Sequence, residues 1–68
     1  MTNPRDIIEE LRKARVNSGM AQIDLAEASG YDRVTIARYE SGCRVPPQLQ
    51  MLCNWAEALG HELTLVKK

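Results

Sequence analysis

Three arginines lie close together in the middle of this chain: Arg33, Arg38 and Arg44. Arginine carries a planar set of N–H donors that matches the edge of a guanine base and also a phosphate group. Catalytic patterns are missing, since no nucleophile is paired with a general base, no glycine-rich phosphate loop occurs, and the single histidine, His61, lies near the C-terminus. The residues that could bind a ligand or react therefore favour binding of nucleic acid over catalysis, and we expect no enzyme activity.

Residues 22–42 predict two short helices joined by a tight turn, which together would position these arginines. Gly30 suits the turn because glycine tolerates a left-handed backbone. Asp32 can cap the second helix by accepting a hydrogen bond from a backbone N–H near Thr35. Ile36 is the apolar anchor of that helix, with polar side chains around it. This is the plan of a helix-turn-helix, in which the second helix enters the major groove of DNA.

The chain resembles the Cro and phage-repressor-like helix-turn-helix family. The resemblance runs from about Ile8 to Gly60. It depends on the order and spacing of all the matching residues together, and no single one of them is diagnostic. It implies a small DNA-binding domain, usually dimeric and usually a transcriptional regulator. The residues that carry it, in order and spacing, are Arg15, Gly19, Gln22, Leu25-Ala26, Gly30, Ile36, Glu40, Gly42, Pro46 and Ala58-Leu59-Gly60.

The predicted fold class is all-α, a helix-turn-helix bundle of four helices in residues 1–60 with a short C-terminal β-strand in residues 61–68. Asn3 and Pro4 open the first helix as its N-cap and first helical residue. Ala21, at the start of the second helix, is a poor N-cap because it lacks a side-chain acceptor, which costs about 1 kcal/mol.

The fourth helix is predicted to begin at Pro47 and to end at Gly60. Its spacing indicates an apolar stripe that packs against the other helices. The residues of this stripe are Leu49, Leu52, Cys53, Ala56 and Leu59.

The C-terminal segment alternates between apolar and polar residues, which predicts a strand with Leu63 and Leu65 on one face and the β-branched Val66 beside them. A lone strand cannot satisfy its own backbone hydrogen bonds, so the simplest partner is the same strand of a second copy. The alternative is a frayed or locally docked tail. If the tail does not form the dimer, the Trp55 face of the fourth helix is the next candidate for the interface.

Composition sets limits on partners and location. Nine basic and nine acidic residues give a net charge of zero, which argues against strong non-specific DNA binding, although a locally basic face is compatible with specific, salt-sensitive binding. No signal peptide or long apolar run occurs, so we expect a soluble, cytoplasmic protein with no membrane partner. Cys43 and Cys53 are expected to be free thiols, and with His61 they lack the spacing of a zinc site, so neither a metal nor a cofactor is expected.

Four residues are expected to face the bases. Arg33 and, five residues later near the same face, Arg38 are the candidates for guanine edges, although a solvated surface role for Arg33 stays open. Val34 is suited to a thymine methyl group. Asp32 has two interpretations, acceptance of a hydrogen bond from cytosine N4 or capping alone, and capping is favoured.

The resemblance implies that Gln22, at the start of the first helix of the motif, would bind a DNA phosphate. Arg44, in the loop after the second helix, is also expected to contact a phosphate. Thr35 would contact either a phosphate or a base, or stay a surface hydroxyl. In the family an arginine and a glutamate at the positions of Arg15 and Glu40 form an ion pair that ties the first helix to the end of the recognition helix.

Two functions follow. The first is a homodimeric transcriptional repressor that binds an inverted-repeat operator on double-stranded DNA; repression is inferred from the small size. The alternative is the antitoxin of a toxin–antitoxin module, which would bind a toxin protein and repress its own operon. The strand-like tail favours the antitoxin, whereas the lack of an additional toxin-binding segment favours the simple repressor.

Overall fold

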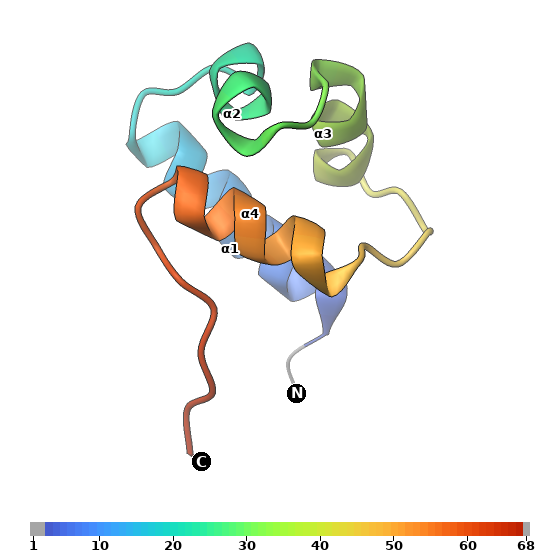
Figure 1. Cartoon of the computed structure of the whole chain (residues 1–68). Coiled ribbons are helices and arrows are strands. Elements are labelled where there is room, and N and C mark those ends of the chain that lie inside the picture. The colour runs from blue at the N-terminus through green and yellow to red at the C-terminus, as the bar shows by residue number, and fades with distance from the viewer. Residues whose placement is uncertain (1–2, 68) are drawn as a thin grey trace.

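A computed structural model describes residues 3–67 as a bundle of four helices (Figure 1). The helices are α1 (Pro4–Asn17), α2 (Gln22–Ser29), α3 (Arg33–Glu40) and α4 (Leu49–Ala58). The pair α1 and α4 forms one layer, and α2 and α3 lie over it, with α2 contacting α3 and α4 and with α3 contacting α1. The all-α prediction is confirmed, and none of these helices is long and apolar enough to cross a membrane.

The starts of three helices follow local sequence chemistry. Asn3 caps α1, since its Oδ1 accepts a hydrogen bond from the N–H of Asp6 at 3.0 Å. Asp32 caps α3, since its Oδ1 accepts from the N–H of Thr35 at 2.7 Å. Both caps were predicted. Ala21 offers no side-chain cap to α2, but the Asp24 carboxylate accepts from the N–H of Ala21 at 2.9 Å, which supplies one half of a capping box.

The core lies between the two layers. Each helix contributes to it, and Ile36 of α3 is fully buried. The Trp55 ring of α4 meets two tyrosine rings edge to face, that of Tyr31 at a centroid distance of 6.4 Å and that of Tyr39 at 5.9 Å. These contacts attach the turn before α3 and the end of α3 to the lower layer. The buried apolar residues are Ile8, Leu11, Leu25, Ala26, Ile36, Met51, Leu52, Trp55, Ala56 and Leu59.

The predicted stripe of α4 is wrong in part. The helix begins at Leu49 rather than Pro47, and the Leu49 side chain is 70% exposed. The buried face is centred between Met51 and Leu52 and continues through Trp55, so Leu49 points about a quarter turn away from its centre. Because Trp55 is only 1% exposed, its face is part of the core and is not available as a dimer interface.

The C-terminal segment, residues 61–67, leaves the bundle as an extended chain with no helix or strand assigned (Figure 1). The N–H of His61 donates to the carbonyl of Ala56 at 2.8 Å, and Leu63 packs half-buried against the core. Pairing of this segment with a second copy stays a prediction, because a strand needs a partner that one chain does not supply. The division into residues 1–60 and 61–68 also stays a prediction, and residues 1, 2 and 68 lie outside the described part of the chain.

Candidate nucleic-acid interface

The turn between α2 and α3 fixes the direction of α3. It consists of Gly30, Tyr31 and Asp32, and Gly30 has φ of 82° and ψ of 10°, in the left-handed region that favours glycine. Hydrogen bonds from the side chain of Thr35 and from its backbone N–H lower the pKa of Asp32 below its ordinary value, and the charge of Arg38 lowers it further. The cap is therefore an ionised carboxylate at neutral pH, next to the helix end that favours negative charge.

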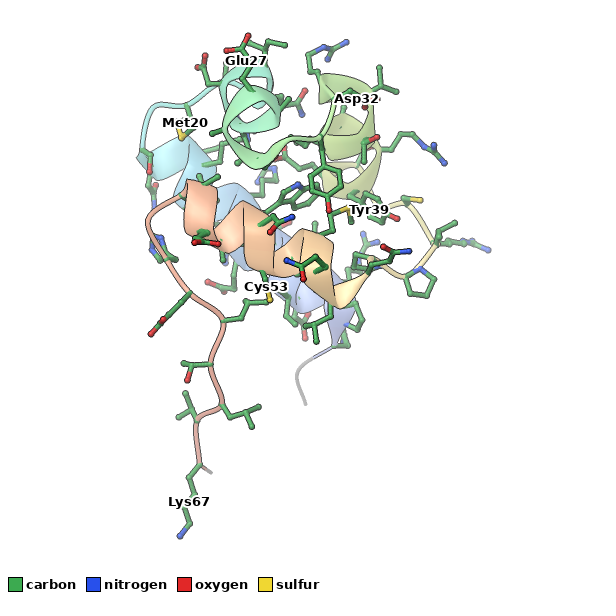
Figure 2. All side chains as sticks on the ribbon, in the orientation of Figure 1. Met20, Glu27, Asp32, Tyr39, Cys53 and Lys67 are labelled. Carbon is green, nitrogen blue, oxygen red and sulfur yellow. The ribbon has the colours of Figure 1, made fainter. Side chains whose placement is uncertain are left out.

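The exposed face of α3 lies opposite the buried Ile36. Val34, which is 58% exposed, and Arg38 are one turn apart on this face. Arg33 is also exposed, but five residues correspond to about 140° around a helix, so the prediction that Arg33 and Arg38 lie near one face is wrong. Val34 lies between them around the helix instead, and Figure 2 shows a nitrogen-tipped side chain projecting from α3 on the side away from α2.

A polar contact anchors the end of α3 to α1. Arg15 Nε donates to Glu40 Oε2 at 2.8 Å, and Arg15 Nη2 donates to Glu40 Oε1 at 2.9 Å, so the two charges meet in a bidentate pair. The side chains are only 13% and 7% exposed, respectively. Arg15 Nη1 also donates to the carbonyl of Met20 at 2.7 Å, which holds the loop between α1 and α2. The structure thus brings together the two residues for which the resemblance implied a pairing.

Gln22 connects this pair to the exposed face. Its Nε2 donates to Glu40 Oε1 at 3.1 Å, and its Oε1 accepts from Arg33 Nη1 at 3.4 Å. From the first turn of α2, the Gln22 amide therefore contacts residues at both ends of α3. Sequence reasoning missed both contacts, since Gln22 and Glu40 are 18 positions apart and no local pattern connects them.

The remaining candidates lie in different places. Thr35 is half-buried and Arg44 is exposed in the loop between α3 and α4. Leu63 to Val66 lie in the C-terminal segment, so the structure does not bring them near α3 (Figure 1). Cys43 and Cys53 are free and half-buried, and no cluster of His, Cys, Asp and Glu suited to a metal ion is found among residues 3–67.

Comparison with known proteins identifies the family. The model of a helix-turn-helix family matches residues 11–66, which include α2, the turn and α3. The chain belongs to this Cro- and repressor-like helix-turn-helix family, and it is a DNA-binding transcriptional regulator. Neither the curated proteins nor the solved structures gave a match.

Proposed function

We propose that the protein is a homodimeric transcriptional repressor that binds an inverted-repeat operator with α3, the recognition helix, in the major groove. The observation that carries this proposal is the surface of α3, where Arg33, Val34 and Arg38 are exposed while Ile36 anchors the helix in the core. Two arginines on either side of an apolar residue offer hydrogen bonds to guanine and an apolar contact to a thymine methyl group. Asp32 stands at the N-terminal end of α3, one turn before Ile36, where capping of the helix already occupies one carboxylate oxygen.

The DNA backbone is proposed to be held on both sides of the recognition helix. Gln22, at the start of α2, is the proposed phosphate contact on one side, and its amide orients Arg33 through the contact at 3.4 Å. Arg44, exposed beyond the end of α3, is the proposed phosphate contact on the other side. The Thr35 side chain lies on the helix itself. Contacts of this kind set the position of the protein on the duplex, whereas the contacts of α3 with base edges supply the sequence preference.

The C-terminal segment is proposed to form the dimer. Leu65 is 99% exposed and Val66 is 83% exposed, whereas Leu63 is half-buried against the core. Antiparallel pairing with a second copy would cover these apolar side chains and satisfy the free backbone groups. It would also hold the two recognition helices at a fixed separation, which must be about 34–36 Å for successive major grooves on one side of the duplex.

The same exposed segment supports the second candidate, an antitoxin that binds a toxin and represses its own operon. Leu65 and Val66 would then contact the toxin as well as, or in place of, a second copy. Purification after co-expression with the product of the adjacent gene tests this candidate. A stable complex that inhibits that product supports the antitoxin, and the absence of a complex leaves the repressor as the proposal.

Selection of bound sequences from a random DNA pool is the primary test. We expect a short site with two-fold symmetry. Arg33→Ala and Arg38→Ala should then each weaken binding by about 1–3 kcal/mol and relax the base preference at one position of each half-site. Binding to single-base variants of the selected site measures this. A loss of equal size on every variant would instead assign these arginines to phosphates, and a pool with no enrichment would contradict the proposal.

A further inference from the structure

Arg5 lies in the first turn of α1, and its side chain crosses to the end of the recognition helix. The guanidinium packs on Gly42, two residues after α3 ends: a Cβ built on Gly42 would lie 3.0 Å from Arg5 Nη1 and 3.3 Å from Nη2. Glycine at this position therefore leaves the space that the guanidinium occupies. The sequence separation of the two residues hides this contact, and neither the family resemblance nor the local pattern pointed to Arg5.

Arg5 and Arg44 line one open cleft of about 640 Å³ beside the loop that follows α3. Neither guanidinium has a hydrogen bond or an ion pair with any residue between 3 and 67. Glu9 and Glu40 also line the cleft, but both carboxylates are already paired within the protein. Asp6 is the remaining carboxylate, so the cleft presents two unpaired cations against one unpaired anion.

We propose that Arg5 is a further contact to the DNA backbone, binding a phosphate next to the one bound by Arg44, on the flank beyond the C-terminal end of the recognition helix. This inference rests on the proposed function. The DNA backbone is the favoured source of the anion because the cleft adjoins the end of α3, and because adjacent phosphates of one strand offer neighbouring anions to two arginines. The planar guanidinium fits a phosphate through two parallel N–H donors.

Binding as a function of salt tests this inference with the full-length protein and the selected operator. The log of the binding constant falls as the log of the salt concentration rises, because each phosphate contact releases a condensed counterion. Arg5→Ala should therefore reduce the magnitude of this negative slope by about 1. We expect affinity at low salt to fall about 3- to 10-fold, equally for every single-base variant of the operator. Arg5→Lys, which keeps the charge, should keep most of the slope. Lys13→Ala is the matched control, because Lys13 is an exposed cation of α1 that pairs with Glu10, and neither residue lines the cleft.

A second pair of variants tests the contact from its other side. Gly42→Ala places a methyl group 3.0 Å from Arg5 Nη1, closer than ordinary van der Waals contact, so the guanidinium must shift, and the salt slope should weaken by less than it does with Arg5→Ala. Gly60→Ala is its control, since Gly42 and Gly60 both have positive φ, 103° and 76°, but Gly60 has open space around it. Urea unfolding of each variant separates loss of binding from loss of folding.

The outcomes are distinguishable. If the wild-type protein binds no selected DNA, the proposed function and this inference both fail. If the wild type binds and Arg5→Ala keeps the wild-type salt slope, only the role of Arg5 is overturned. A loss confined to one base position would also overturn it, since it would make Arg5 a base contact.

Discussion

The core of the helical body, residues 3–60, and the end of the C-terminal segment, residues 61–67, contain the same kinds of apolar residue in opposite environments. In the body Leu25 is 1% exposed and Ile36 is fully buried, whereas in the segment Leu65 is 99% exposed. A helix in the bundle is covered from several sides, but an extended segment that leaves the bundle meets only one surface. Residue type alone therefore does not bury a side chain, because burial requires a surface that covers it.

Polar residues of the body repeat this lesson. Arg15 and Glu40 meet at 2.8 Å in a site that is almost closed to solvent. The Glu9–Arg12 pair, at 3.4 Å, has side chains 51% and 45% exposed, respectively. Exposed pairs contribute little because water and salt screen them, whereas removal of one partner of a buried pair leaves a charge without compensation.

The largest expected effect on folding comes from Glu40→Ala. It removes the acceptor for both Arg15 and Gln22 and should lower the free energy of unfolding by about 3 kcal/mol, near the low end for breaking a buried pair. Arg12→Ala, the exposed control, should change it by less than about 1 kcal/mol. Urea unfolding of the two variants measures the difference. Equal midpoints would mean that the Arg15–Glu40 pair contributes no more than a surface pair.

A smaller effect is expected from Asp32→Ala, which removes the exposed cap of α3. Because the pKa of Asp32 is lowered in the folded state, the ionised cap stabilises the fold above the unfolded pKa, and this contribution is lost as pH falls through the folded value. The variant should therefore unfold at a lower temperature than the wild type at neutral pH, with the difference shrinking in acid. Asp32→Asn, which keeps an acceptor without the charge, is the control. A difference that stays constant down to acid pH would contradict the role of the charge.

The smallest effect on folding, and the largest on association, is expected from deletion of residues 62–68. The deletion spares His61, whose N–H donates to Ala56, and among the described residues 62–67 it removes one half-buried side chain, that of Leu63. The helical body should keep its helix content while the dissociation constant of the dimer rises, and binding should fall much more for a full operator than for a half-site. Sedimentation of the truncated protein is the direct measurement. A truncated protein that is still dimeric at low micromolar concentration would place the interface on the helical body.

Features that depend on neighbours along the chain could be predicted from the sequence. The cap by Asn3, the cap by Asp32 and the turn at Gly30 each follow from hydrogen bonds or backbone freedom within a few residues. The register of the whole motif was also sufficient to predict the family.

Contacts between distant residues became known from the packing of the helices. The fold placed Trp55 in the core and Leu49 in solvent, because the packing of α4 on the bundle, and not the spacing of apolar residues alone, selects the buried face. The bridge from Gln22 to Glu40 and the packing of Arg5 on Gly42 join segments far apart in sequence. Contacts of this kind depend on how the helices cross, and no local pattern of residues encodes a crossing.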